Sequence, residues 1–207
     1  MFGFTEDERD LVKETFNVGV GRAAAGLSEL VDDRYEIRLS VPHVSVLTAR
    51  ELVEAIAGQS DGEVCAVTQA YEGVLTGTAM LVYSVRESLT LVGIMLGESA
   101  DVEHLGEVAR DALREVGNIL LNDTLAALAD LVEAELVTQL PEVHTGTCDE
   151  VMCVLAGGEP DAKLLHLEMD FALDARELNG HLGLSLGVGS AAALRDLLRK
   201  HLVAMGI

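Results

Sequence analysis

The sequence contains no tryptophan, and its aromatic residues make up only 3% of 207 residues. Hydrophobic residues nevertheless make up 49% of the chain, which is enough to bury a sizeable core and argues against disorder. We therefore expect a core of leucine, valine, isoleucine and alanine. No apolar run reaches the length of a membrane span, and the acidic first residues lack the basic character of a secretory signal peptide. These absences predict a cytoplasmic protein without membrane insertion.

Basic residues are also scarce: 14 lysines and arginines stand against 35 acidic residues, and the net charge is −21. The only lysines are Lys13, Lys163 and Lys200. A negative field of this size repels nucleic acid and anionic membrane surfaces, so neither is expected as a partner. Two interpretations of the acidity stay open: an ordinary solvated surface, or an adaptation to high salt, where screening removes the repulsion between like charges.

The residues of several common kinds of site are missing or wrongly spaced. The three cysteines, Cys65, Cys148 and Cys153, are too few and too scattered for a disulfide framework, and we expect them to be buried as small apolar residues. The six histidines show no metal-ligand spacing. The sequence has neither a glycine-rich phosphate loop nor a serine in a nucleophile elbow, and Ser84 and Ser190 are expected to begin helices instead.

Hydrophobic periodicity, capping residues and glycine stops predict a similar series of elements in each half. In the first half we expect a helix from Thr5 to about Val31, a strand over Glu36–Val46, a short helix from Thr48 to Gly58, a hairpin of Glu63–Tyr71 and Val74–Ser84 that turns at Glu72-Gly73, and a helix over Arg86–Leu96. In the second half we expect a helix over about Glu103–Glu135, a short helix from Thr147 to Gly157, strands over Lys163–Leu173 and His181–Val188, and a helix from Ala191 to about Ala204. Thr-x-x-Glu capping boxes begin three of these helices, at Thr5, Thr48 and Thr147. Gly19 and Gly21 fall inside the first helix, where small residues allow close helix packing.

The correspondence between the halves indicates a tandem duplication of about 100 residues. Pro42 and Pro141 are 99 residues apart, and a capping threonine follows six residues after each proline. Because proline cannot donate to a sheet ladder, Pro42 indicates an edge strand or a bend. We predict an α+β fold in a single domain over residues 1–207, with repeats at about 1–100 and 101–207. The two hairpins are expected to merge into one antiparallel sheet flanked by helices, with pseudo-twofold symmetry.

One polar motif, Asp-x-x-x-Glu-x-x-Asn, occurs in both long predicted helices, as Asp10-Glu14-Asn17 and as Asp111-Glu115-Asn118. The spacing places the three side chains on one face of the helix, roughly opposite the apolar residues, so we expect them to point outward. The next position on this face is Gly21 in the first helix and Asn122 in the second. A solvated polar surface is the alternative interpretation, but two copies in matching register favour a function.

Glutamate and asparagine one turn apart restrict the chemistry that this face can perform. An exposed glutamate lacks the burial that usually raises a carboxyl pKa for acid–base catalysis, and an asparagine side chain cannot act as a base. An asparagine amide can instead hold a water in line for attack, and a carboxylate can bind a cation on another molecule. The motif therefore suits a partner that brings its own metal and electrophile, such as a phosphorylated protein.

The duplicated motif resembles that of the CheC family of chemotaxis phosphatases, whose relatives include CheX and FliY. In this family the motif begins with Asp or Ser, and 22 residues separate its asparagine from a proline. The second copy fits this spacing from Asn118 to Pro141, whereas 24 residues separate Asn17 from Pro42. The stretch from Glu14 to Ser28 is also similar to the family's first helix, and the resemblance extends over essentially the whole chain.

The resemblance implies hydrolysis of the phosphoaspartate on the response regulator CheY. Asn17 and Asn118 would orient the attacking water, and Glu14 and Glu115 would hold the regulator's active-site lysine. The Mg²⁺ ion would belong to the regulator, so no cofactor or metal site is expected in this chain. The receptor deamidase CheD is implied as a second partner. The supporting positions of the motif are Asp10, Asp111, Pro42 and Pro141.

Two alternatives belong to other functional classes. One is an adaptor that binds CheD or phosphorylated CheY without turnover, and the intact glutamate and asparagine of both copies argue against it. The other is a structural component of the flagellar switch, and the lack of the C-terminal module found in FliY argues against that.

Overall fold

The computed structural model describes residues 4–31, 37–57, 63–96, 106–155, 161–173, 176–186 and 190–206. The first half of the chain contains α1 (Glu6–Leu30), β1 (Ile37–Thr48), α2 (Ala49–Ala57), β2 (Glu63–Gly73), β3 (Gly77–Ser84) and α3 (Val85–Leu96). The second half contains α4 (Glu107–Val132), β4 (Leu136–Thr138), β5 (Glu142–Thr147), α5 (Cys148–Leu155), β6 (Lys163–Leu173), β7 (Arg176–Leu186) and α6 (Ser190–Met205). The halves follow the same order, except that β4 and β5 together stand where the first half has β1.

The strands form one antiparallel sheet in the order β1-β6-β7-β3-β2, and both β4 and β5 pair with the free side of β2. The first strand of each half therefore pairs with the second strand of the other half: β1 with β6, and β5 with β2. The strands β3 and β7 pair in the middle of the sheet. The predicted α+β fold with a shared antiparallel sheet is confirmed, and the exchange of strands follows a pseudo-twofold relation.

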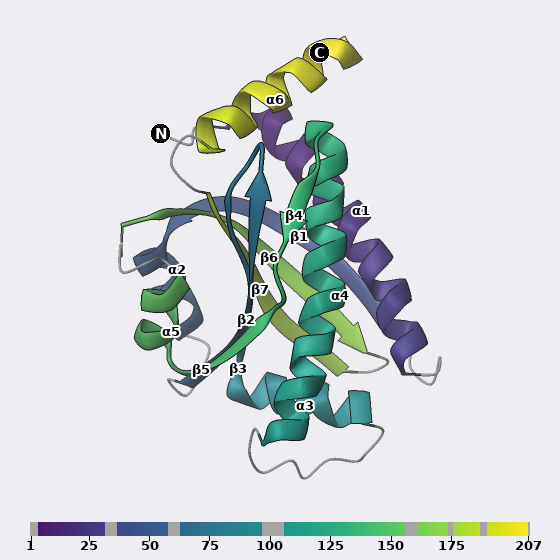
Figure 1. Ribbon diagram of the computed structural model, residues 1–207, viewed down its shortest axis with the longest axis vertical. Coiled ribbons are helices and arrows are strands. Elements are labelled where there is room, and N and C mark those ends of the chain that lie inside the picture. Colours follow the sequence, from purple (N-terminus) through teal and green to yellow (C-terminus); the bar gives the residue numbers. More distant parts are fainter. Residues whose placement is uncertain are drawn as a thin grey trace.

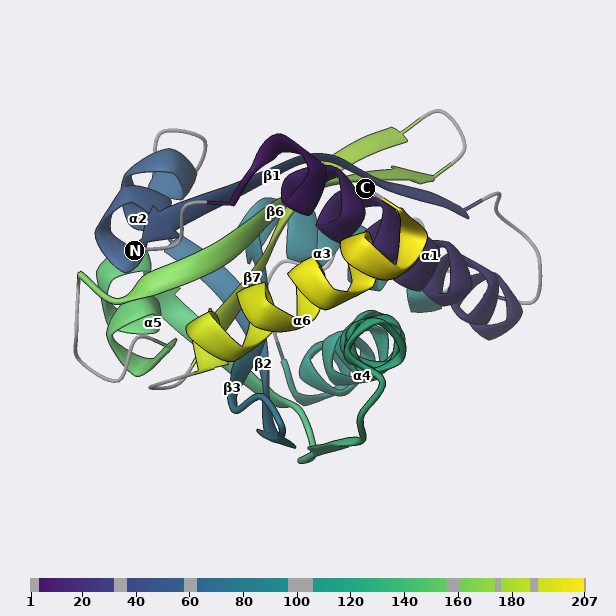
Figure 2. The same ribbon diagram turned by 90° about the horizontal axis from the view of Figure 1, so that it is seen from above.

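Helices lie on both faces of this curved sheet (Figure 1). The two long helices, α1 and α4, lie on one face, with α6 across one of their ends and α3 near the other. The view from above shows α2 and α5 together on the opposite face (Figure 2). The molecule thus has three layers, and α1 and α4, which carry the two polar motifs, share the same outer layer.

Two apolar cores hold these layers together. The larger lies between the sheet and the layer of α1 and α4, and Phe16, Leu27 and Leu120 are fully buried in it. The smaller lies under α2 and α5 around Leu52 and Met152. Burying one such side chain stabilises the fold by about 1.5–3 kcal/mol relative to exposure. Aliphatic residues dominate both cores, as the scarcity of aromatic residues predicts.

The two long helices cross closely at a glycine. A Cβ on Gly19 would lie 3.0 Å from the backbone oxygen of Asp123, so a larger residue there would push α1 and α4 apart. Further along α1, Gly26 faces Ile119, which precedes Asp123 in α4, so the helices run antiparallel. The predicted role in close packing is confirmed for Gly19. It is wrong for Gly21, since a Cβ there would meet nothing within 4 Å.

The predicted capping boxes are present. At the start of α1, Oγ1 of Thr5 accepts from the backbone N–H of Glu8 at 3.2 Å, and Oε2 of Glu8 accepts from the backbone N–H of Thr5 at 2.8 Å. The same reciprocal pairs form at Thr48 with Glu51 and at Thr147 with Glu150. Ser84 begins α3 in the same way with Glu87, and Ser190 is the first residue of α6, as expected.

Both prolines interrupt an edge of the sheet. β1 is an edge strand of the described sheet and pairs with β6, with a shift of register between Ser40 and His43, so the prediction of an irregular edge strand at Pro42 is confirmed. On the other edge, the residues Gln139–Pro141 separate β4 from β5. Proline lacks the N–H that a regular ladder requires, which explains why each first strand breaks at this point.

The structure corrects several predicted boundaries. The hairpin does not turn at Glu72-Gly73, because β4 pairs with these residues and extends β2; the turn follows at Val74–Thr76. Gly73 has a φ of +154°, and a Cβ there would lie 2.5 Å from the Glu135 oxygen. The helix predicted to reach Glu135 ends at Val132, since Glu133 is left-handed with a φ of 52°. Other predicted boundaries lie outside the described residues, at Glu36, Gly58, Glu103, Gly157 and Val188.

Two further sequence predictions concern the last hairpin and the cysteines. The strand predicted to start at His181 starts at Arg176, because its first residues pair with the end of β6. Cys65 and Cys148 are buried as expected, whereas Cys153 is exposed on α5, so the prediction for it was wrong. None of the three forms a disulfide within the described residues, and burial raises the pKa of the Cys65 thiol to about 11.

Candidate functional site

Each long helix carries one copy of the polar motif on its outer face. In α1, Asp10 and Glu14 are exposed and Asn17 is half-buried. In α4, Asp111 and Glu115 are likewise exposed and Asn118 is half-buried. The acidic residues therefore face solvent, and the asparagines lie at the edge of the helix face, where their amides can reach groups beneath them. The two copies are alike in the exposure of their three residues, but different groups contact the two asparagine amides.

The two motifs are separate sites. Because α1 and α4 run antiparallel, the part of α1 that faces the second motif is Gly26, which contacts Ile119 beside Asn118. Gly26 is nine residues from Asn17, which corresponds to about 14 Å along the helix. The motifs lie on opposite sides of the helix crossing at Gly19, so each can be approached by a different molecule.

The amide of Asn17 is held by the edge strand. Its Oδ1 accepts a hydrogen bond of 2.8 Å from the backbone N–H of Val41. Since a backbone N–H can only donate, this bond fixes the amide with its oxygen turned toward β1. Nδ2 of Asn17 has no partner among the described residues. Val41 precedes Pro42, and a residue before proline is restricted to extended conformations, which keeps this N–H in place.

The amide of Asn118 is held by a chain of other amides. Its Oδ1 accepts from Nδ2 of Asn122, one turn further along α4, at 2.9 Å. Oδ1 of Asn122 in turn accepts from Nε2 of Gln69 at 2.9 Å and from the hydroxyl of Thr138 at 3.2 Å. Nε2 of Gln69 also donates to the backbone oxygen of Gln139 at 2.8 Å. Both asparagines therefore have their oxygen held from inside the molecule.

Within the described residues, Glu14 and Glu115 have no hydrogen-bond or ion-pair partner, so both carboxylates can bind a cation from outside. The aspartates at the first motif position differ. Asp111 forms a close ion pair with Arg114, while Asp10 has no such partner in the described part of the chain. An exposed pair of this kind contributes at most about 1 kcal/mol to stability, so it affects the charge of the surface more than the fold.

Exposed apolar side chains lie beside both motifs. Val18 follows Asn17 and is 45% exposed. Near the second motif, Val137 and Leu140 flank the Thr138 and Gln139 groups that hold the amide chain, and they are 68% and 86% exposed. Each site thus combines acidic and amide groups with an accessible apolar surface, an arrangement suited to contact with another protein.

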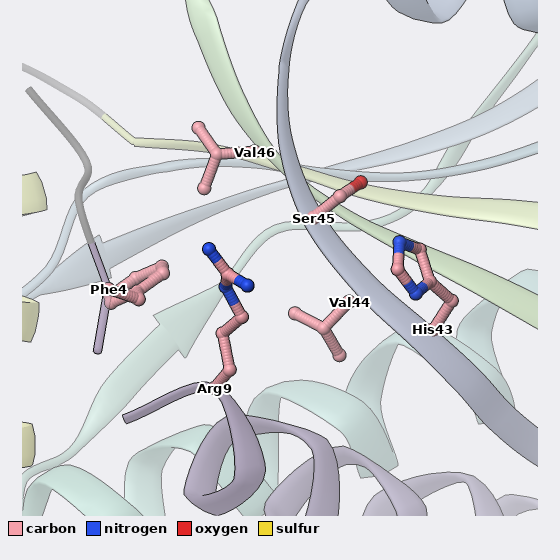
Figure 3. A pocket seen from close by; sticks show the side chains of 6 residues that line it. All are labelled: Phe4, Arg9, His43, Val44, Ser45 and Val46. Atoms are coloured by element: carbon pink, nitrogen blue, oxygen red, sulfur yellow. The ribbon is translucent and has the colours of Figure 1, made fainter. Parts of the chain in front are cut away.

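A hollow of about 270 Å³ lies between the start of α1 and β1. Arg9 rises into it between Phe4 and Val44, with His43 and Ser45 further along β1 (Figure 3). Arg9 lies eight residues, or just over two helical turns, before Asn17 in α1. Its basic and apolar lining differs from the acidic motif, and none of the predicted site residues lines it.

Sequence reasoning missed two groups of buried polar residues. Gln69 is 2% exposed and lies in an apolar stretch of β2. The only indication of a special role in the sequence is that a polar residue stands among apolar ones. Nε2 of His166 lies 3.2 Å from Nδ1 of His181, and Nδ1 of His166 lies 3.1 Å from the hydroxyl of Ser45. Burial, together with the neighbouring His181 and His43, lowers the pKa of His166 to about 4; burial also lowers the pKa of His181. These histidines face away from α1 and α4, since Ser45 alternates with Val44, which packs in the larger core.

Within the described ranges, no cluster of three or more histidine, cysteine or acidic residues is arranged to hold a metal ion. Nor does any helix in that part of the chain have the length and apolar character needed to cross a membrane.

Comparisons with known proteins agree with the fold. No protein-family model matches the chain. The CheY-P phosphatase CheC of Bacillus subtilis (strain 168) is 33% identical over 144 residues, which cover 68% of each chain. The crystal structure of Thermotoga maritima FliY superposes with a TM-score of 0.79 at 20% identity and covers 96% of this chain and 98% of that one. A CheC-like superfamily protein from Shewanella sp. PV-4 has a TM-score of 0.54 at 14% identity, over 89% and 99% of the two chains.

Proposed function

The chain belongs to the CheC family, and from this premise we propose that it hydrolyses the phosphoaspartate of a CheY-type response regulator. The observation that supports this most directly is the pair of outward motifs, each with an asparagine amide whose oxygen is held from inside. A site of this kind offers an amide to position a water and an exposed carboxylate to bind a cation, and no cluster in the described residues is arranged to hold a metal ion. It suits a substrate that is a protein and brings the reacting groups with it.

In the proposed reaction, Asn17 or Asn118 positions a water in line with the phosphorus of the docked regulator. The Nδ2 group donates to the water oxygen and limits its motion, which lowers the entropic part of the barrier. The water oxygen forms a bond to phosphorus while the bond to the aspartate carboxylate breaks, and the water's proton passes to the released phosphate or to solvent. The Mg²⁺ of the regulator would neutralise charge on the phosphoryl oxygens.

We propose that Glu14 and Glu115 bind the regulator's active-site lysine. Each glutamate lies one turn before the asparagine and is exposed, so a docked ammonium group can reach it. A charge-assisted hydrogen bond between carboxylate and ammonium would fix the position of the regulator relative to the water. The glutamates would therefore affect docking and alignment, and the asparagines would affect the chemical step.

The experiment that tests the proposal is a decay assay of the phosphorylated regulator with the full chain. The Asn17→Ala/Asn118→Ala double variant should return the decay rate to that of the regulator alone, because no positioned amide remains. Circular dichroism should show that the fold is retained, because both asparagines are only half-buried. The melting temperature should fall, since the Val41 N–H and Nδ2 of Asn122 lose their acceptors. A double variant as active as the unchanged chain would refute the phosphatase. If the unchanged chain binds the regulator without altering its decay, an adaptor is the better description.

A second partner, the receptor deamidase CheD, forms part of the proposal because the family resemblance implies it. We also propose that the protein acts in the cytoplasm with its regulator. Co-elution of the purified chain with CheD on size-exclusion chromatography tests the first point, and separate elution at micromolar concentrations would count against it.

A further inference from the structure

The amide chain behind Asn118 has a role that the motif alone does not indicate. We propose that Asn122 and Gln69 are positioning residues of the second site, and that they determine which end of the Asn118 amide faces the phosphorylated partner. The inference rests on the proposed function, because it concerns how the second site performs that reaction.

The orientation is set by one group that cannot be reversed. The backbone oxygen of Gln139 can only accept, so Gln69 must present Nε2 to it, at 2.8 Å. The same nitrogen donates to Oδ1 of Asn122 at 2.9 Å, which leaves Nδ2 of Asn122 to donate to Oδ1 of Asn118. A single backbone carbonyl therefore determines the orientation of three side-chain amides in sequence.

Burial makes this orientation hard to reverse. Gln69 is 2% exposed, and its Oε1 is buried without a hydrogen-bond partner in the described structure. An unsatisfied buried acceptor costs about 1–3 kcal/mol. Turning the Gln69 amide over would place Oε1 against the Gln139 oxygen and against Oδ1 of Asn122. Two such contacts between acceptors cost more free energy than the single unpaired Oε1. The unpaired Oε1 of Gln69 therefore fits an amide chain whose donor–acceptor orientation is fixed.

The direction matters because the partner is an anion. With Oδ1 held by Asn122, Nδ2 of Asn118 has no partner among the described residues and is left for the docked molecule. An N–H group attracts a phosphoryl oxygen or the oxygen of the attacking water. The reversed amide would present an acceptor to the phosphoryl group and repel it.

The first site reaches the same orientation without such a chain. Val41 donates its backbone N–H directly to Oδ1 of Asn17. The position equivalent to Asn122 is Gly21, around which a Cβ would meet nothing within 4 Å. The role of Asn122 and Gln69 is therefore specific to the second site, and the first site provides an internal reference.

The test measures regulator decay at one site at a time in the full chain. Asn17→Ala leaves only the second site, and Asn118→Ala leaves only the first. Asn122→Asp is then added to Asn17→Ala: the carboxylate has nearly the shape of the amide but no donor, so Asn118 turns Nδ2 inward to reach it. We expect kcat to fall roughly tenfold or more. KM should stay within about twofold, because the outward glutamate and the apolar rim are unchanged.

Matched variants separate orientation from other effects. Ala126→Asp places the same charge one turn further along the exposed side of α4 without touching the amide chain, and kcat should stay within about twofold. Gln69→Leu should lower kcat less than Asn122→Asp, because Thr138 still donates to Oδ1 of Asn122. The first-site rate of Asn118→Ala/Asn122→Asp reports whether the protein remains folded.

Three results would overturn the inference. The first is that Asn122→Asp has no specific effect. In that case kcat of Asn17→Ala/Asn122→Asp stays within twofold of that of Asn17→Ala, or Ala126→Asp lowers kcat equally. The second is loss of the first-site rate together with thermal stability, which would indicate a merely structural role. The third is an Asn17→Ala chain without any acceleration, since the second site would then not turn over. Failure of the proposed function is distinct: the unchanged chain would then leave the decay rate unaltered, or the Asn17→Ala/Asn118→Ala chain would still accelerate decay.

Discussion

The two copies of the motif present the same three residues and support them in different ways. Behind Asn17 lies a backbone N–H of the edge strand, and behind Asn118 lies the chain of amides that ends at Gln139. The residues before the asparagines differ as well. Phe16 is fully buried and fills the space beneath α1, whereas Gly117 lets α4 approach β2 so closely that a Cβ would lie 2.3 Å from Val67.

The outward residues of the two motifs are the same although the groups that support them differ. Both arrangements end with an asparagine oxygen held inward and a nitrogen left for a partner. The first achieves this with one bond to a strand that the proline restrains, and the second with side chains that require α4 to lie close to β2. The difference in proline spacing, 24 residues against 22, accompanies this difference in support. The two sites should therefore respond differently to substitutions beneath the helix.

The largest expected effect is at Phe16. Phe16→Ala removes a fully buried ring from the larger core, and the free energy of unfolding in urea should fall by about 3–5 kcal/mol. Val18→Ala is the matched control, since Val18 is 45% exposed, and it should change stability by no more than about 0.5 kcal/mol. Similar losses for the two variants would contradict the assignment of Phe16 as the spacer beneath the first site.

The second prediction concerns the pH dependence of stability and contrasts two histidines, each of which lies beside a hydroxyl group in the sheet. His166 is buried beside Ser45, while His144 is more accessible beside Thr68. In the fold the pKa of His166 is lowered from 6.5 to about 4, so unfolding takes up a proton between these values. Stability should therefore fall as pH drops from about 6.5 to 4, by up to about 3 kcal/mol.

Urea unfolding at a series of pH values measures this dependence. The His166→Gln variant should have a flatter profile over that window, because its side chain does not titrate. His144→Gln should keep the steep profile of the unchanged chain. A steep profile in the His166→Gln variant would show that other groups cause the loss.

The third effect is at Gly117, the counterpart of Phe16. Gly117→Ala forces α4 away from Val67, and we expect a loss of about 1–3 kcal/mol in stability from overpacking. Because Asn118 is the next residue, kcat of the second site, measured in the Asn17→Ala background, should fall more than kcat of the first. Gly21→Ala, in open space on α1, should instead stabilise the helix by about 0.5–1 kcal/mol. Equal loss at both sites would argue against a local effect.

The substitution with the smallest expected effect is at Gly21. Gly21→Asn gives α1 the residue that α4 has at this position. Since Val41 already holds the oxygen of Asn17, kcat of the first site, measured in the Asn118→Ala background, should change by less than about twofold. A large gain would mean that the backbone N–H is a poorer support than the amide chain.

The sequence predicted features that depend on near neighbours and missed features that depend on register. The capping boxes, the edge strand at Pro42 and the outward acids of both motifs follow from spacings of a few residues. The turn at Glu72-Gly73 was wrong because β4, more than 60 residues further on, pairs with these residues and extends the strand. Gln69 could not be assigned for the same reason: its bond to Asn122 exists only once α4 has packed on β2.

The exchange of first strands between the halves also bears on how the protein is made. Ile37 in β1 pairs with Leu173 in β6, 136 residues later, so β1 has no neighbour in the sheet until most of the chain has been synthesised. Pairings over such separations slow folding, and the waiting strands are prone to mispairing with other chains. A product that stopped after α3 would contain β1, β2 and β3 with the pairing sites for β5, β6 and β7 open. Two such products can pair their β1, β2 and β3 edges with each other, as the two halves of the full chain do. A truncated chain should therefore assemble as a homodimer.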